Sequence, residues 1–219
     1  MSAADLITVK NLHFTFPTGR KVLNGVDLYL RTGERLALIG ANGAGKSSLL
    51  HCLMGLVTAE NGEIAILGSR CETESEFCAV RGRVGLLFQD SDDQLFCPTV
   101  LEDVMFGPLN LGQSRDDARK IAMQTLADLG LDGFETRITY QLSGGEKRLV
   151  ALATVLAMSP EILLLDEPTN GLDADVEQLL IAILRSLSQA MVIISHDHLF
   201  LDQVATRSVR LQDGVISKA

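Results

Sequence analysis

Apolar residues recur with two different spacings along this chain, and the changes between them divide the sequence. Mostly apolar runs of strand length lie at 36–39, 84–88, 162–165 and 191–194. Between the last two runs, apolar residues three and four positions apart predict a helix over 174–188. Its predicted inward face consists of Val176, Leu179, Leu180, Ile183, Leu184 and Leu187. Apolar strands that alternate with helices predict a mostly parallel sheet covered on both faces.

Alternation of apolar and polar residues marks further strands near both ends of the sequence. Residues 6–16 and 22–30 predict two strands, and 63–67 predicts a third. Residues 207–217 predict a hairpin, because an Asp-Gly pair at its centre favours the tight turn that joins two antiparallel strands. Residues 68–82 are polar, and no element is predicted there.

The middle of the chain, from about residue 90 to 160, contains no predicted strand. Residues 99–107 predict a short helix that is stopped by Gly107-Pro108. Ser114 is a predicted N-cap, and Gly130 is the matching C-terminal stop. The helix between them carries Ala118, Ile121, Ala122, Thr125, Leu126 and Leu129 on one face. We interpret the whole segment as a helical lobe inserted between strands of an α/β core.

Length and charge restrict the classes of protein and partner. The chain has 219 residues, enough for one core with an inserted lobe. Its net charge of −9 argues against nucleic acid as a partner and against attachment to anionic lipid through basic residues. The apolar runs are too short to span a membrane, and residues 1–8 lack the features of a signal peptide. The spacing of the four cysteines favours free thiols over a disulfide framework or a zinc site.

The candidate chemistry begins directly after the run at 36–39. Residues 40–48 read Gly-Ala-Asn-Gly-Ala-Gly-Lys-Ser-Ser and lead into a predicted helix over 45–54, which is the pattern of a phosphate-binding loop. Glycines allow several backbone N–H groups to point at one anion, and the helix dipole adds to the attraction. We expect Lys46 to lie between the outer two phosphates and the Ser47 hydroxyl to bind Mg²⁺. The predicted nucleotide-binding residues here are Asn42, Gly43, Gly45, Lys46, Ser47 and Ser48. The alternative is an ordinary glycine-rich turn.

Two adjacent carboxylates follow the apolar run at 162–165. Ligands of open α/β sheets bind beyond the carboxyl ends of the strands, near the place where the phosphate loop also begins. We therefore expect Asp166 to hold Mg²⁺ and Glu167 to face the terminal phosphate and polarise the attacking water. Taken alone, such a pair is also typical of a solvated strand end.

A second helix start lies at Leu142-Ser143-Gly144-Gly145-Glu146, before an apolar helical pattern that stops at Ser159-Pro160. Small residues at a helix N-terminus can form an anion site. An N-capping serine followed by a glycine turn explains the same residues. Local physics alone favours this second explanation.

Taken together, these residues resemble the nucleotide-binding subunit of an ABC (ATP-binding cassette) transporter, over roughly residues 5–217. The motifs that carry the resemblance, in family order, are the phosphate loop 40–47, Gln89, the signature 142–146, Asp166-Glu167, Gly171-Leu172-Asp173 and His196. The resemblance implies a P-loop NTPase fold of the ABC-ATPase type, with a mostly parallel core sheet, an antiparallel β subdomain and an inserted helical lobe. It implies one domain, 1–219, with its core at 1–89 and 160–219 and the lobe at about 90–159.

The same resemblance implies a mechanism based on two subunits. A head-to-tail homodimer or heterodimer of ATPase subunits would enclose two ATP molecules, and Ser143 and Gly145 of one subunit would bind the γ-phosphate held by the other. Asp173 would contact the opposite subunit.

Within each subunit, the resemblance assigns three further roles. Gln89 would sense Mg²⁺ and the attacking water and link the core to the lobe. His196 would hold the γ-phosphate and orient Glu167. Phe16 stands where the family has an aromatic that stacks on adenine, although a phenylalanine after a strand is also a common core residue.

Residues 88–96 and 98–108 resemble the loop after the glutamine in ATPases of the energy-coupling factor (ECF) type. That resemblance implies a peripheral ATPase on the cytoplasmic face of the membrane, which energises an importer of a transition-metal ion (cobalt or nickel) or of a vitamin such as biotin. Residues 89–108 would contact an integral membrane subunit. Asp90, Asp92 and Asp93 could meet its Arg or Lys side chains, or they could simply form a solvated loop.

Two other functions stay open at this point. A soluble ABC-type regulatory or assembly ATPase would use ATP-dependent dimerisation without transport, although the single cassette without an insert favours transport. A P-loop kinase of small molecules is disfavoured, because it has no use for residues 142–146. One departure from the family concerns Leu149, which stands where many members have Arg or Gln.

Overall fold

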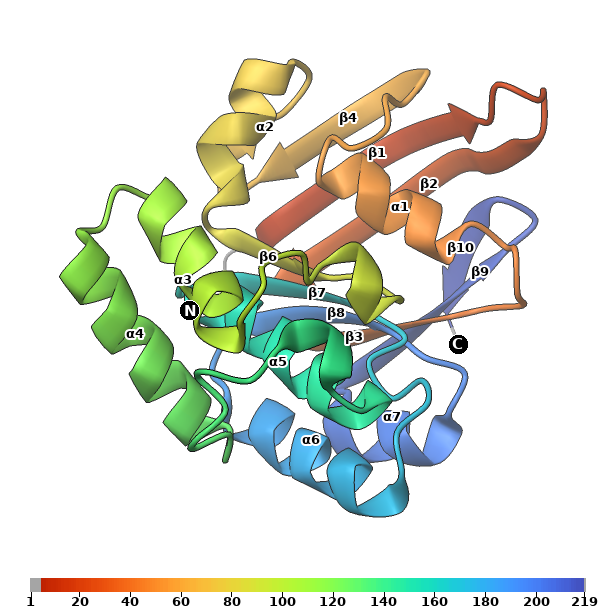
Figure 1. The fold of residues 1–219 in the computed structure, drawn as a ribbon. Helices are drawn as coiled ribbons and strands as arrows, with labels where there is room; N and C mark the ends of the chain where they lie inside the picture. The colour runs from red at the N-terminus through yellow and green to blue at the C-terminus, as the bar shows by residue number, and fades with distance from the viewer. Residues whose placement is uncertain (1–4, 219) are drawn as a thin grey trace.

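Six strands form the central sheet of the protein, in the order β10-β9-β3-β8-β7-β6 (Figure 1). The computed structural model describes residues 5–218. All neighbouring strands of this sheet run parallel except the hairpin β9–β10, as the apolar runs predict. The bounds are β3 Arg35–Ile39, β6 Val84–Leu87, β7 Ile162–Asp166, β8 Ala190–Ile194, β9 Arg207–Gln212 and β10 Val215–Lys218.

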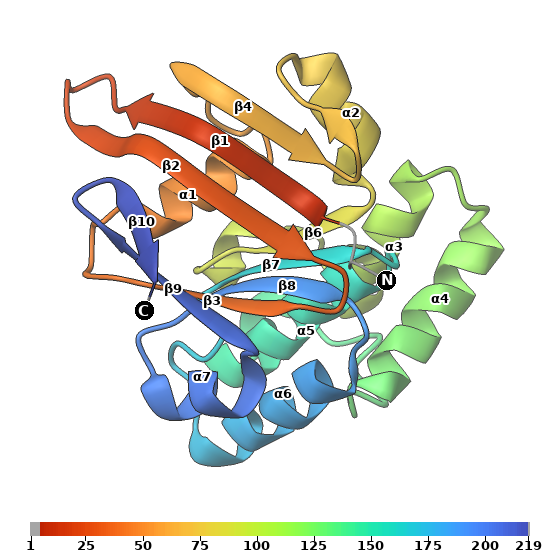
Figure 2. The same ribbon diagram turned by 180° about the vertical axis from the view of Figure 1, so that it is seen from behind.

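A second, antiparallel sheet has the order β2-β1-β4-β5. Its strands are β1 Asp5–Thr15, β2 Lys21–Arg31, β4 Asn61–Ile66 and β5 Ser69–Arg70. Figure 2 shows this sheet from its outer side, with helix α1 (Lys46–Leu53) behind it. The predicted strands near the N-terminus and the predicted antiparallel subdomain are therefore confirmed.

The central sheet separates two apolar cores, because alternate residues of its strands point to opposite faces. Along β8, Val192 and Ile194 face the core that contains α1 and the antiparallel sheet. Met191 and Ile193 face the other core, which is built from the helices α3 to α7. This is why these strands are apolar at every position, and it confirms the predicted burial on both faces.

The helices that follow β6 lie to one side of the sheet (Figure 1). They comprise η1 Ser91–Asp93, α3 Val100–Asn110, α4 Arg115–Asp128, η2 Thr139–Gln141 and α5 Gly144–Leu156, and α6 Ala174–Ser186 and α7 His198–Val204 follow after β7. The caps of α4 lie as predicted, since the Ser114 side chain accepts from the Asp117 N–H and Gly130 has a φ of 70°. The boundaries of the lobe stay a prediction.

Two sequence predictions were wrong in detail. The helix predicted to stop at Gly107-Pro108 continues to Asn110. A proline removes a single N–H donor, and the next carbonyls still find partners: the N–H of Leu111 donates to Gly107 and that of Gln113 to Pro108.

The polar segment 68–82 contains α2 (Glu74–Arg81), which begins with a capping box formed by Thr73 and Glu76.

On α6, Leu179 is 40% exposed, although it is predicted on the inward face, and Ile181 is buried instead. Leu179 lies at the flank of the helix, one residue before the face that contacts the sheet. Among the helices of residues 5–218, none combines the length and the apolar character that crossing a bilayer requires.

Candidate active site

The loop between β3 and α1 is shaped by glycines that no other residue could replace without strain. A Cβ on Gly40 would lie 2.3 Å from the carbonyl oxygen of Leu211, and one on Gly45 would lie 2.3 Å from Cγ1 of Val22. Gly45 is also left-handed, with a φ of 105°. Helix α1 starts from Gly45 without any side-chain cap. Its first N–H groups are therefore available to a ligand, which is the arrangement of an anion site.

Two cations accompany this loop. Lys46 is buried, and its Nζ donates to the carbonyls of Gly40 at 2.8 Å and Ala41 at 3.1 Å. Arg20, which belongs to none of the sequence motifs, donates from Nη2 to the carbonyl of Gly43 at 2.8 Å. Both charges favour an anionic ligand in the loop.

Asp166 ends β7 directly beside the first turn of α1. Its side chain is buried, it lines the same cavity as Ser47, and its Oδ1 has no hydrogen-bond partner. Burial raises the pKa of Asp166, the charge of Glu167 adds to this, and the Ser47 hydroxyl opposes it. An unpartnered carboxylate oxygen beside a serine hydroxyl suits a hard cation such as Mg²⁺. Within 5–218, no three His, Cys, Asp or Glu side chains form a metal site of their own.

Glu167 is buried in an unusual backbone conformation, with a φ of 46°. Its Oε2 lies 2.9 Å from Nδ1 of His196 and accepts from the main-chain N–H of the same residue at 3.4 Å. The His196 side chain is itself 70% exposed. A carboxylate that is held on one side and open on the other can accept a proton from a bound water.

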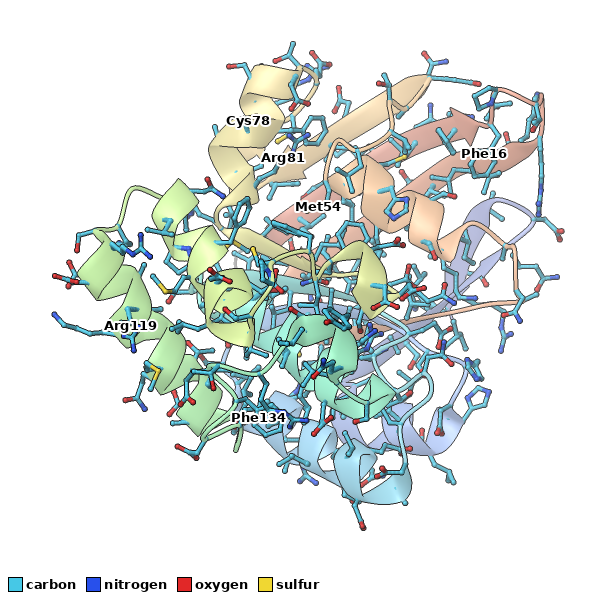
Figure 3. The ribbon with its side chains drawn as sticks, in the orientation of Figure 1. Phe16, Met54, Cys78, Arg81, Arg119 and Phe134 are labelled. Carbon is cyan, nitrogen blue, oxygen red and sulfur yellow. The ribbon has the colours of Figure 1, made fainter. Side chains whose placement is uncertain are left out.

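A cleft of about 560 Å³ brings these groups together. Of the predicted residues, it is lined by Phe16, Asn42, Gly43, Gly45, Lys46, Ser47, Ser48, Gln89, Asp166, Glu167 and His196. Phe16 lies just after β1 (Figure 3). Its ring meets that of Phe14 edge to face, with 5.1 Å between the ring centroids. Phe16 is not a core residue, because 38% of its surface is accessible.

Ser143 and Gly145 do not line this cleft. Ser143 caps α5, where its hydroxyl accepts from the N–H of Glu146 and the Glu146 carboxylate accepts from the Ser143 N–H. Arg137 donates to the same carboxylate at 2.7 Å. A Cβ at Gly144 would meet no atom within 4 Å, so this helix start is open on its outer side. Asp173 likewise caps a helix, accepting from the N–H of Val176 at the start of α6.

Comparison with known proteins identifies the family. The family model described as ABC transporter matches residues 23–170. The chain belongs to the ABC transporter family. It is thus an ATP-binding chain of an ATP-hydrolysing enzyme family, and the fold predicted from the resemblance is confirmed.

Two relatives illustrate how far sequence similarity to this ABC ATPase extends. A provisionally named ABC transporter ATP-binding protein of Nitratidesulfovibrio vulgaris is 51% identical over 96% of this chain and 78% of its own length. The energy-coupling factor transporter ATP-binding protein EcfA of Methanothermobacter thermautotrophicus is 43% identical over 95% of this chain and 68% of its own.

Solved structures give the same fold. The CbiO1 protein of Clostridium perfringens, described as part of the ABC transporter complex CbiONQ, has a TM-score of 0.85 at 30% identity and covers 97% of this chain and 87% of its own. An ATP-binding cassette solved as a dimer in a post-hydrolysis state with ADP and phosphate has a TM-score of 0.88 at 28% identity and covers 97% of this chain and 98% of its own.

Proposed function

We propose that this ABC ATPase hydrolyses ATP as one half of a head-to-tail pair and energises an ECF-type importer of a transition-metal ion, such as cobalt or nickel, or of a vitamin such as biotin. The observation that carries the proposal is the division of the site. The 560 Å³ cleft gathers the loop, the carboxylates and His196, while Ser143 and Gly145 of the second helix start are not among the residues that line it. Their neighbours Leu142 and Gly144 line an adjoining cavity of about 540 Å³, which shares Ser47 and Asp166 with the cleft. The similarity to EcfA and to CbiO1 supports the ECF assignment.

Within the cleft, each group has a role that its surroundings support. Lys46 and the N–H groups at the start of α1 bind the β- and γ-phosphates, and Phe16 stacks on adenine. Ser47 and Asp166 would hold Mg²⁺, which neutralises charge on the transferred phosphoryl group when it is bound. Both residues line the same cleft.

The hydrolytic step needs a base aimed at a water molecule. Glu167 takes the proton of that water, because its carboxylate is buried, held by His196 and open toward the cleft. Gln89, at the end of β6, positions the same water and contacts the cation. His196 has an exposed ring that can also reach the γ-phosphate.

The second half of the site comes from another subunit. The open helix start at Ser143 and Gly145 binds the γ-phosphate held by its partner, whether that partner is a second copy or a different ATPase subunit. The dimeric cassette with ADP and phosphate, which has the same fold, supports this arrangement.

The membrane subunit docks on an apolar groove of about 480 Å³ between α2 and α3. Met54, Cys78 and Arg81 line its α2 side (Figure 3), and Phe96 and Phe106 line its α3 side. The two phenylalanine rings meet edge to face at 4.8 Å although they are 64% and 46% exposed. Exposed apolar clusters of this kind mark interaction sites. The chain would thus be peripheral at the cytoplasmic face of the membrane.

The aspartates of the loop after Gln89 line a separate cavity, beside Gln89 and Asp166, rather than this groove. Asp92 forms an ion pair with Lys147, and Asp90 accepts from the N–H of Asp92. These carboxylates are engaged within the chain, so we assign the docking mainly to the apolar groove.

Copurification from membranes tests this proposal. We expect the tagged chain to carry a polytopic membrane protein with it, and we expect Phe106→Ser to lose that protein while keeping ATP hydrolysis. Met123→Ser, a substitution of an exposed apolar residue on α4, serves as the control and should retain the partner. ATP hydrolysis without any membrane partner would instead favour a soluble regulatory ATPase.

A further inference from the structure

Arg148 is a buried arginine in α5 that makes no ion pair with a carboxylate in residues 5–218. All its bonds go to main-chain carbonyls. Nε donates to Pro168 at 3.0 Å, Nη1 donates to Phe88 and to Gln89, and Nη2 donates to Asp166 at 2.8 Å and to Glu167. A guanidinium group has five N–H donors, so this side chain uses all of them.

Burying a cation without a contacting counter-ion is costly, and the structure keeps this one charged. Burial lowers the pKa of Arg148 to about 10, while the charges of Asp166, Asp90 and Glu167 oppose that shift. The guanidinium is therefore still protonated at neutral pH. Because this charged group binds only main-chain carbonyls, it fixes the backbone conformation of the segments that carry them.

The backbone that it binds is the one that presents the proposed base. Three successive carbonyls, of Asp166, Glu167 and Pro168, turn toward the same guanidinium. An extended strand sends successive carbonyls in alternate directions, and here the chain instead passes through the left-handed conformation at Glu167, with a φ of 46°. A non-glycine residue holds such a conformation only where its surroundings fix it.

The other arm of the guanidinium reaches the end of β6. Its bonds to Phe88 and Gln89 fix the point at which Gln89 leaves the sheet. Gln94 reinforces the same junction, because it donates to the carbonyl of Ala151 in α5 and accepts from the N–H of Phe88. Helix α5, which starts at Ser143, is thus joined to both strand ends of the cleft.

We infer that Arg148 is a positioning residue for ATP hydrolysis, which fixes the backbone of Glu167 and Gln89 relative to helix α5. The inference rests on the proposed function, since it assigns Glu167 and Gln89 to the hydrolytic step. It extends that function because Arg148 connects two parts of the site. Helix α5 is proposed to bind the nucleotide held by the partner, and Glu167 and Gln89 act on the nucleotide held by the same subunit. Arg148 itself is not among the residues that line the 560 Å³ cleft.

The test compares Arg148→Lys, Arg148→Met and the control Arg119→Lys in the full chain. Arg119 is exposed on α4 (Figure 3). A fluorescent ATP analogue gives the affinity and the number of binding sites, steady-state assays give kcat per site, and hydrogen exchange follows the segment 166–171. Counting kcat per binding site removes any loss that is due only to misfolded protein.

For Arg148→Lys we expect affinity within about threefold of wild type and a roughly 10- to 100-fold lower kcat per site, the range that small misplacements of reacting groups produce. The amide of Asn170, which donates to the Glu167 carbonyl, should exchange faster. The kcat per site should fall further in Arg148→Met and should stay at the wild-type value in Arg119→Lys.

Two results overturn the positioning role: an unchanged kcat per site in Arg148→Lys, or a loss of nucleotide binding in both Arg148 variants, which would make the residue a support of the fold as a whole. Failure of the proposed function looks different, because the wild-type protein would then hydrolyse no ATP. Active wild type with inactive Glu167→Gln and fully active Arg148→Lys would refute the positioning role alone.

Discussion

Two helix starts of this protein that contain glycine, at α1 and α5, differ in how the free N–H groups of their first turns are satisfied. Helix α1 begins at Gly45 with no side-chain cap, so its first N–H groups depend on a ligand. Helix α5 begins with a complete capping box between Ser143 and Glu146, supported by Arg137. The first start is therefore incomplete without an anion, whereas the second is stable alone and offers an open outer side at Gly144. We expect the first to fix nucleotide affinity and the second to act only when subunits meet.

The largest effect is expected for Glu167→Gln, in the cleft that contains the start of α1. Glu167→Gln keeps the shape of the side chain and removes the base, so we expect kcat to fall by about 10²- to 10⁴-fold with nucleotide binding retained. ATP should then trap the dimer, which gel filtration with and without ATP would detect. The matched control is Glu161→Gln, just before the opposite end of β7, where the carboxylate pairs with Arg83. Normal hydrolysis by Glu167→Gln would remove Glu167 from its proposed role.

A smaller effect is expected for Lys46→Ala. Loss of a charged hydrogen-bond donor to phosphate corresponds to about 1.5–3 kcal/mol, or roughly a 10- to 150-fold weaker nucleotide affinity. Equilibrium binding of a fluorescent ATP analogue measures this directly. Lys120→Ala, on the exposed side of α4, should bind like wild type. An unchanged affinity for Lys46→Ala would contradict the assignment of the phosphate loop.

The smallest effect separates the two helix starts most cleanly. Ser143→Ala removes the cap of α5, at a cost of about 1 kcal/mol in the free energy of unfolding. In the Glu167→Gln background, we expect it to weaken ATP-dependent dimerisation and leave the affinity of the monomer for ATP unchanged, as measured by analytical ultracentrifugation.

Ser114→Ala is the control for that experiment, because Ser114 caps α4 through the same kind of bond to the third N–H of the helix. It should lose similar stability and dimerise normally. Equal dimerisation defects in both variants would show that only stability is involved.

The sequence predicted the first helix start well because its chemistry is local. Nine consecutive residues contain the glycines, Lys46 and Ser47, and a strand and a helix flank them. The second start was assigned from family resemblance alone, and its capping box shows why local reasoning favoured an ordinary helix. The roles of Ser143 and Gly145 depend on another molecule, which no pattern within one chain can show.

Other features were missed for identifiable reasons. Helix α2 buries only Phe77 and Val80, too few for an apolar period, although the Thr73–Glu76 capping box was readable. The partners of Arg148 come from two distant segments, so only the folded chain reveals them. One signal was available: Leu152 and Val155, four and seven positions later, place residue 148 on the buried face of its helix.

The position of β3 has a consequence for how the protein is made. This strand, which leads into the phosphate loop, lies between β8 and β9, and its partners there, as in Arg35–Met191 and Leu36–Arg207, are 156 and 171 positions further along the chain. During synthesis on the ribosome, β1 and β2 can pair early. The sheet partners of β3, in contrast, are made only in the last fifth of the chain. A polypeptide that stops before β8 therefore leaves the strand before the phosphate loop without either of its sheet neighbours, and we expect it to lack the capacity to bind ATP.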